Sequence, residues 1–344
     1  MTNPEATVQC PDFKDRKTGL VVFGILEIIL GAICALMVPF MIFGLIVSAT
    51  LSKNSAQPMN FGIIIMSVLF YALIAVWFIW MGIGSIKARR WARALLLVSS
   101  WLWLISGIFG LINMLIFMPD MYGQMAQKGQ IPKEMAVIMT YGMLGFLAVV
   151  YIIIPGVLVL FYGNKNVKMT CERRDPQMRW TDKCPLPVLA ISLVSGVCAI
   201  GTLLMGFFGW TVPFFGYVLN GIAGAGVVLV AMVLLGYVAW GTYKLSVKAW
   251  WCAVLMVIAW GISICITFSR ESSLLDLYEK MNLSPQELEL IKQSVMSHYS
   301  GMTVIFGVWT AGLLGYLIYT KRYFKSPAIP EQPVNNIYNS EKSL

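Results

Sequence analysis

Eight long runs of apolar residues, each bounded by charged or turn-forming residues, constrain this 344-residue chain more than any other feature. Each run can cross a hydrocarbon layer about 30 Å thick, which takes about 20 helical residues. Lipid offers no partners to backbone polar groups, so the runs are expected to be helices. The predicted spans are Gly19 to about Ala49, Phe61–Ile86, Trp91–Phe117, about Ala136–Gly163, Leu186–Gly209, about Gly216–Tyr243, Ala249–Phe268 and Met302–Thr320.

Composition supports the same class. Only 12% of the residues are charged and 58% are hydrophobic, whereas a soluble domain carries about 25% charged residues to cover its surface. The apolar run after Gly19 is too long for a cleaved signal peptide, so it is expected to be retained as a span. The sequence therefore predicts an all-α integral membrane protein with about eight transmembrane helices.

The distribution of Lys and Arg predicts the orientation of these helices. Nineteen of the 25 Lys and Arg residues fall in the N-terminal segment, in the loops after the second, fourth and sixth spans, and in the C-terminal tail. Cytoplasmic loops carry this excess of positive charge. Both termini are therefore expected in the cytoplasm, in a plasma membrane or bacterial inner membrane, with anionic lipid headgroups as partners of the basic face.

An internal repeat is also predicted. Shifting residues 62–107 by 159 lays them on residues 221–266 without a gap, with eleven identities in forty-six positions. Gly82 then meets Gly241, and Trp91 meets Trp250. We interpret the pattern as a tandem repeat of two four-helix units in the same orientation, related by an axis along the membrane normal. The predicted segments are an N-terminal segment 1–18, repeats 19–163 and 186–322, a connector 164–185 and a tail 323–344.

Glu27 is the one acidic residue deep in a predicted span. An ionised carboxylate there is costly unless it is paired, hydrated or protonated. The residue is a candidate proton or ion site, and the alternative is a neutral or partnered structural glutamate near the headgroups. Arg93 lies at the inner end of the third span and is a possible partner of Glu27. The alternative for Arg93 is that its side chain reaches the inner interface alone.

Three tryptophans beside basic residues, Trp91, Trp250 and Trp251, are predicted anchors at the inner interface. Cys10, Cys171 and Cys184 lack the paired C-x2-4-C spacing of zinc sites, so no metal or other cofactor is expected. Pro155 is predicted to break the fourth span as a packing kink.

His298 is the single histidine and is expected to be an exposed helical residue, because no nucleophile or orienting partner accompanies it. We therefore expect no enzymatic activity. The net charge of +9 is distributed over loops that flank the membrane and comes with no nucleic-acid-binding motif, so nucleic acid is not an expected partner.

Two functions stay open on sequence grounds. The first is a small-solute or ion transporter, which the duplicated topology and Glu27 favour. The second is a non-transporting scaffold, assembly factor or lipid-interacting module, which the scarcity of polar residues in the spans favours. An argument from architecture does not establish either function.

Overall fold

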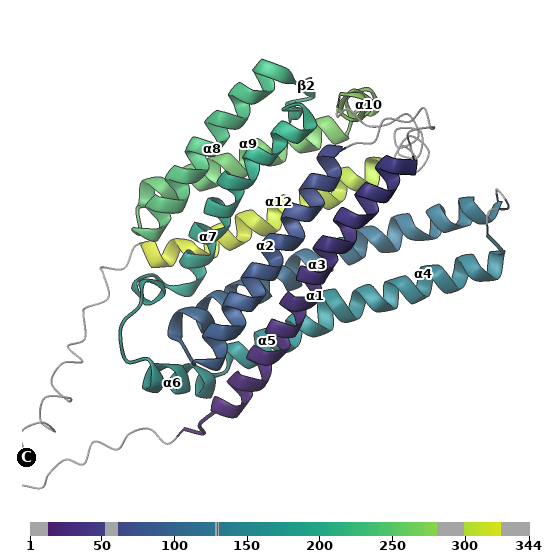
Figure 1. Cartoon of the computed structure of the whole chain (residues 1–344). Coiled ribbons are helices and arrows are strands. Elements are labelled where there is room, and N and C mark those ends of the chain that lie inside the picture. The colour runs from purple at the N-terminus through teal and green to yellow at the C-terminus, as the bar shows by residue number, and fades with distance from the viewer. Residues whose placement is uncertain (1–12, 52–60, 128, 130, 281–298, 325–344) are drawn as a thin grey trace, which may run out of the picture.

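The computed structural model describes residues 13–51, 61–127, 129, 131–280 and 299–324. Within these ranges, eight helices are long and apolar enough to cross a membrane by length and composition. Figure 1 shows them as a bundle of long helices. The predicted class, a multi-pass helical membrane protein, is confirmed at this level.

The first half of the chain forms four spans and a connector. The fourth span is built from two helices that are joined by a five-residue π-helical turn. The elements are α1 (Lys17–Leu51), α2 (Phe61–Ile86), α3 (Arg90–Gln127), α4 (Lys133–Ala148), the π-helical turn η2 (Val149–Ile153), α5 (Ile154–Gly163), the connector helix α6 (Lys165–Arg174) and the 3-10 turn η3 (Trp180–Lys183).

The second half has four spans and two smaller features, a β-hairpin and a short helix, which lie at the end of the bundle away from α6. The elements are α7 (Leu186–Gly201), the 3-10 turn η4 (Thr202–Phe208), β1 (Val212–Phe214), β2 (Tyr217–Leu219), α8 (Gly221–Tyr243), α9 (Val247–Phe268), α10 (Glu271–Glu279), α12 (Tyr299–Thr320) and the 3-10 turn η6 (Lys321–Phe324).

The hairpin differs from the prediction, which placed the start of a helix at about Gly216. The two-residue loop between β1 and β2 has positive φ at both Phe215 (48°) and Gly216 (86°), as a type I′ hairpin turn requires. The Phe215 N–H donates to Ser263 Oγ at 2.9 Å, and Ser273 Oγ donates to the Gly216 carbonyl at 2.8 Å. Hydrogen bonds from α9 and α10 therefore hold a turn that the apolar sequence did not indicate.

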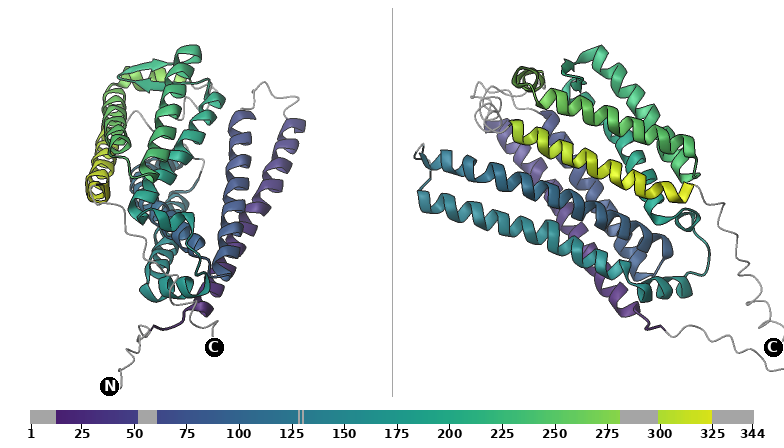
Figure 2. Two further views of the ribbon diagram at one scale, coloured as in Figure 1. Left: turned by 90° about the vertical axis from the view of Figure 1, so that its left-hand side faces the viewer. Right: turned by 180° about the vertical axis from the view of Figure 1, so that it is seen from behind.

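Each half packs around its own core. α1 runs along α2 and α3 along α4 and α5, as α7 runs along α8 and α9 along α12. The first core includes Leu20, Met81 and Tyr162, all fully buried. The two halves meet at several places, and at one of them the rings of Phe109 in α3 and Trp309 in α12 pack at an angle, with centroids 4.7 Å apart. Figure 2 shows the α1–α2 pair extending away from the second half.

The turns that follow α2 and α8 have the same geometry. Ala88 and Leu245 have positive φ values of 49° and 57°. The N–H of Ala88 donates to the Ser85 carbonyl and that of Arg89 to the Gly84 carbonyl, and Leu245 and Ser246 repeat both bonds with Thr242 and Gly241. These bonds define a Schellman helix ending.

Glycine at the start of each turn lets the next helix approach. A Cβ atom on Gly84 would lie 2.5 Å from the Ala92 Cβ, and one on Gly241 would lie 2.4 Å from the Ala249 Cβ. At these two turns Gly84 and Gly241 occupy similar positions, 157 residues apart, whereas the predicted alignment used an offset of 159.

The fourth span changes its winding just before Pro155. A proline cannot donate a hydrogen bond to the carbonyl four residues earlier, and its ring crowds that carbonyl. The π-helical turn Val149–Ile153 widens the helix at this point. A Cβ atom on Gly107 of α3 would lie 2.4 Å from the Tyr151 carbonyl oxygen. The break in the span is thus a π-helical turn against which α3 packs closely.

The cationic loops lie together at one end of the bundle, which we call the basic end. There the connector binds both the N-terminal segment and the turn after α2. Arg174 pairs with Asp15 at 2.8 Å, and Arg89 pairs with Asp175 at 3.3 Å. The tail of α12 lies at the same end, where Lys321 stacks over the Trp251 ring at 5.2 Å.

Candidate functional site

Glu27 lies on the α1 face that packs against α2. The residue is fully buried, and glycines one turn to either side bring the two helices together. A Cβ atom on Gly24 would lie 2.8 Å from the Gly82 carbonyl oxygen, and one on Gly31 would lie 3.0 Å from the Ala75 carbonyl oxygen. Small residues permit this close approach of helix backbones in membranes. Glu27 is therefore enclosed between two close helix contacts.

Helix direction explains why Glu27 meets side chains from the ends of two other helices. Side chains of an α-helix lean toward its N-terminus. Glu27 therefore leans toward the basic end, where α1 begins. Ser85 and Tyr162 belong to α2 and α5, which run toward the basic end, so their side chains lean the opposite way. Tyr162 and Ser85 are almost completely buried beside Leu20 and Met81.

A chain of hydroxyl groups joins these residues. The Tyr162 hydroxyl and Ser85 Oγ lie 2.7 Å apart. Ser85 Oγ also donates a hydrogen bond to the Leu20 carbonyl oxygen at 3.0 Å. Tyr162 is also the polar side chain that interacts with Glu27. However, neither Glu27 carboxyl oxygen has a hydrogen-bond partner of acceptable geometry among the residues that the structure describes.

The direction of these hydrogen bonds depends on the proton of Glu27. Each hydroxyl has one proton to donate. When Ser85 donates to Leu20, Tyr162 must donate to Ser85, and its oxygen could accept a hydrogen bond only from a neutral Glu27 carboxylic acid that moved within reach. When Glu27 is ionised, Tyr162 can donate to the carboxylate and Ser85 can donate to Tyr162. Loss of the Glu27 proton would therefore reverse the direction in which both hydroxyl groups donate their hydrogen bonds.

Charge makes the neutral state of Glu27 the favoured one in this geometry. No ion pair to Glu27 occurs in the described part of the chain. Burying an unpaired carboxylate in a protein interior costs several kcal/mol even after relaxation. The enclosed site accordingly suits a carboxylic acid, and ionisation would require water, a cation or movement of the helices.

Arg93 does not join this site. Its charged neighbours are Glu172 and Asp182, on the connector side of α3, together with the Cys171 thiol. The Arg93 Nε atom is buried and has no hydrogen-bond partner among described residues. Glu27 and Arg93 form no ion pair in the same set of residues, so the structure does not bring the two predicted partners together.

The three predicted anchor tryptophans occupy different environments. Trp251 is 50% exposed, but Trp250 is only 3% exposed and its Nε1 donates to the Leu317 carbonyl at 2.9 Å. Trp91 packs against Trp80, with ring centroids 5.0 Å apart. Trp250 thus belongs to the core of the second half.

Hydrogen bonds to Asp175, which is 2% exposed, hold the connector in place. Arg179 donates two hydrogen bonds to its carboxylate, at 2.8 and 3.1 Å, and the Arg90 N–H donates a third at 3.3 Å. Burial alone would raise the pKa of Asp175. The hydrogen bonds from Arg179 and Arg90 and the charges of Arg179 and Arg89 outweigh burial and hold that pKa below its ordinary value.

The cysteines of the connector are not arranged as ligands. Cys171 and Cys184 are free and buried in the cores of different halves. Burial raises the pKa of each thiol to about 11, whereas metal binding requires the thiolate. No group of three potential metal ligands occurs within the described ranges. Cys10 and His298 lie outside the described residues.

The second half has no counterpart of Glu27. Helices α7, α8, α9 and α12 contain no Asp or Glu. The buried polar side chains of these spans are hydroxyl groups, among them Ser195, Thr242 and Thr320. The carboxyl site is therefore a feature of the first half alone.

Sequence reasoning identified Glu27 but missed Ser85 and Tyr162. Both are next to the last residue of a helix that ends at the basic end, α2 and α5 respectively. Their shared position near the ends of two helices was the one feature of the sequence that could have placed them at the same depth in the membrane. Hydroxyl residues are common near helix ends, however, and nothing in the sequence distinguishes these two from the others.

Comparisons of the chain with protein-family models, with curated proteins and with solved structures found no match. The class of the protein therefore follows from its own helices. Their number, length and apolar surface define an integral membrane protein that crosses the membrane several times.

Proposed function

We propose that this protein is a proton-coupled transporter of a small solute or ion, and that Glu27 is its proton-binding residue. One observation carries the proposal: a fully buried carboxyl group without an ion pair or hydrogen-bond partner among described residues, next to a chain of two hydroxyl groups. Ionisable groups inside membrane proteins are costly and mark ion paths and proton relays.

In this proposal, Glu27 is neutral in the enclosed state. It releases its proton when α1 and α5 separate enough to admit water or a cation to the carboxyl group. Tyr162 and Ser85 then reverse their hydrogen bonds and stabilise the carboxylate. Rebinding of a proton returns the hydroxyl groups to their first direction and allows the helices to close.

The π-helical turn η2 supports this movement. Single π-helical turns within α-helices are frequent at functional sites and allow helices to bend. The turn lies in the fourth span before α5, which carries Tyr162. Bending at Val149–Ile153 would shift Tyr162 relative to Glu27, whereas α1 and α2 stay together through Gly24 and Gly31.

We also propose that the chain is a tandem repeat of two four-helix units in the same orientation, with the basic end in the cytoplasm of a plasma or bacterial inner membrane. The shared Schellman turns at Gly84 and Gly241 and the matching order of packed helices support the repeat. The concentration of Lys and Arg at the basic end supports the orientation.

The test is an uptake screen with the full chain in sealed proteoliposomes under an imposed pH gradient. We expect at least one small solute or ion to accumulate with wild type. The Glu27→Gln variant should lower that uptake by at least about tenfold, equivalent to about 1.4 kcal/mol. Glu134→Gln is the matched control, because Glu134 is exposed at the start of α4. Equal uptake by wild type and Glu27→Gln would contradict the proposal.

The alternative function, a non-transporting scaffold, assembly factor or lipid-interacting module, predicts a different outcome. It expects no uptake of any solute by a correctly folded wild type, and a structural effect of Glu27→Gln on thermal stability alone. The scarcity of polar residues along the spans favours this alternative. The enclosed carboxyl group favours transport, because a purely structural core has no need of an unpaired acid.

A further inference from the structure

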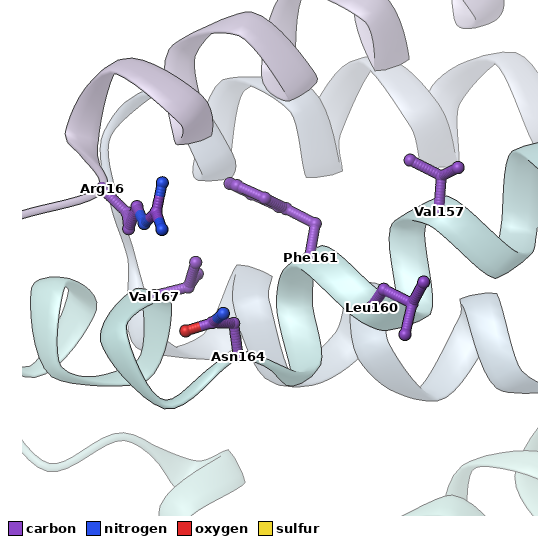
Figure 3. Close-up of a pocket in the computed structure, with 6 residues that line it drawn as sticks. All are labelled: Arg16, Val157, Leu160, Phe161, Asn164 and Val167. Carbon is purple, nitrogen blue, oxygen red and sulfur yellow. The ribbon is translucent and has the colours of Figure 1, made fainter. Parts of the chain in front are cut away.

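A hollow of about 310 Å³ opens on the side of the bundle at the basic end (Figure 3). It lies where the start of α1, the end of α5 and the start of α6 meet. The residues that line it are Arg16, Val157, Leu160, Phe161, Asn164 and Val167. Because α5 ends at Gly163, the hollow extends from the last turns of a span to its boundary with the aqueous phase.

One wall of the hollow is apolar and exposed on the outside of the bundle. Val157 is 45% exposed and Leu160 is 77% exposed. Phe161 is held in place by stacking on Phe23, with ring centroids 4.1 Å apart. A Cβ atom on Gly19 would lie 2.8 Å from the Phe161 ring, so glycine at this position lets α1 approach. This wall is fixed by packing and offers a surface for a hydrocarbon chain.

The opposite rim is polar and cationic. The Arg16 N–H donates to Thr170 Oγ1 at 3.0 Å, which fixes the backbone of Arg16 against α6. Asn164 Oδ1 accepts from the Asn166 N–H at 2.8 Å, and no hydrogen bond from its amide N–H groups occurs among the residues that the structure describes. The rim also lies at the N-terminus of α6, where the helix dipole favours an anion.

Arg16 differs from two arginines of the neighbouring connector, Arg174 and Arg179. Arg174 and Arg179 are each paired with a carboxylate at 2.8 Å. Among residues 13–51 and the other described ranges, no ion pair engages the Arg16 guanidinium. Its positive charge is therefore open to an external anion at the edge of an apolar wall.

We propose that this hollow binds a membrane phospholipid with an anionic headgroup. The phosphate binds Arg16 and the Asn164 amide, and one acyl chain lies along Val157, Leu160 and Phe161. Charge complementarity selects the headgroup, and the apolar wall selects an amphiphile over a free anion. The site joins α1 to α5, the helices of Glu27 and Tyr162, yet the proposal does not depend on transport.

The test is native mass spectrometry of the purified full chain after exchange into phosphatidylglycerol or phosphatidylcholine. Wild type should retain at least one phosphatidylglycerol molecule and release phosphatidylcholine. Arg16→Gln should lower retention of phosphatidylglycerol by about tenfold, equivalent to about 1.4 kcal/mol. Arg173→Gln is the matched control, because Arg173 is exposed on α6 and does not line the hollow. Equal retention by Arg16→Gln and wild type would overturn the proposal.

A second variant tests the acyl chain. Val157→Trp places a large side chain in the hollow from an exposed position, so the fold should tolerate it. We expect it to lower retention as Arg16→Gln does, whereas Arg16→Lys should restore most of it. If inorganic phosphate displaces the lipid from wild type and Val157→Trp has no effect, the hollow is a phosphate site and the lipid proposal is wrong. Added phosphatidylglycerol should raise the unfolding temperature of wild type but not that of either weakened variant.

Discussion

The Tyr162 hydroxyl lies 2.7 Å from Ser85 Oγ, so α5 and α2, which both end at the basic end, share one hydrogen bond in the core of the first half. Ser85 in turn lies 3.0 Å from the Leu20 carbonyl oxygen of α1. Three helices that carry no charged pair between them are thus linked at one buried point. Glu27 lies beside this point and has no partner of its own among the described residues.

Tyr162→Phe separates the role of this hydroxyl in the proposed proton transfer from its role in packing. Removing it deletes a buried hydrogen bond, so we expect the free energy of unfolding to fall by about 1 kcal/mol. Proton-coupled uptake should fall much further, by about tenfold, because each 1.4 kcal/mol corresponds to a factor of ten. Tyr316→Phe is the control, because Tyr316 donates to the Pro187 carbonyl in the other half. A loss of stability with unchanged uptake would show that Tyr162 only supports the fold.

Asp175→Asn should loosen the connector. The substitution removes the negative charge that Arg179 and Arg89 share, although both arginines are partly exposed and screened by water. We expect the free energy of unfolding to fall by about 1–2 kcal/mol, within the range for hydrogen bonds to charged groups. Asp15→Asn breaks an exposed pair with Arg174 and should cost less than about 1 kcal/mol. Thermal unfolding in detergent measures both, and equal effects would contradict the central role of Asp175.

The same aspartate predicts a pH dependence. Its pKa is lowered in the folded protein, so its stabilising contribution is fully present above the unfolded pKa of about 3.9 and is lost as the pH falls through the lower folded value. As the pH falls below about 4, wild type should therefore lose more stability than Asp175→Asn. Parallel stability curves for the two proteins would argue against this assignment.

Gly84→Ala and Gly241→Ala test the two matching turns. Each added Cβ would lie within 2.5 Å of an alanine Cβ on the following helix, and overpacking of this kind costs about 1–3 kcal/mol. Gly236→Ala is the control, because no atom lies within 4 Å of its Cβ position and alanine favours the helix by about 1 kcal/mol. Unfolding measurements should show two similar losses and no loss for the control. A loss at one turn only would show that the turns are not equivalent.

Cysteine labelling tests the proposed orientation. Asn164→Cys places a thiol at the basic end, and Tyr217→Cys places one on the hairpin, where Tyr217 is 74% exposed. In sealed right-side-out cells, a membrane-impermeant maleimide should label the variant at position 217 and spare the variant at position 164, with wild type as the background. The opposite labelling pattern would contradict the proposed orientation and place the basic end outside the cell.

The sequence was sufficient to predict the spans because long apolar runs have few alternatives in lipid. It also singled out Glu27, because an acid in such a run is rare. It did not predict the β-hairpin, since Phe215 adopts a left-handed conformation and the hydrogen bonds that hold its turn come from the distant helices α9 and α10. It also did not predict the Tyr162–Ser85 contact, because the contact depends on how α2 and α5 end beside α1.

The predicted partnership of Arg93 shows another limit. Arg93 and Glu27 were expected at similar depths, but depth does not fix the direction in which a side chain points around its helix. Arg93 faces the acids of the connector, and Glu27 faces Tyr162.

Infrared difference spectroscopy of the full chain in lipid bilayers, titrated with pH, tests the central claim most directly. Wild type should show the C=O band of a protonated carboxylic acid at neutral pH, which fades in alkaline buffer as the carboxylate bands grow. Glu27→Gln should lack this band, and Tyr162→Phe should shift it, because removal of the neighbouring hydroxyl changes the polarity around the acid. Identical spectra for wild type and Glu27→Gln at every pH would contradict the account of Glu27 as a group that binds and releases a proton.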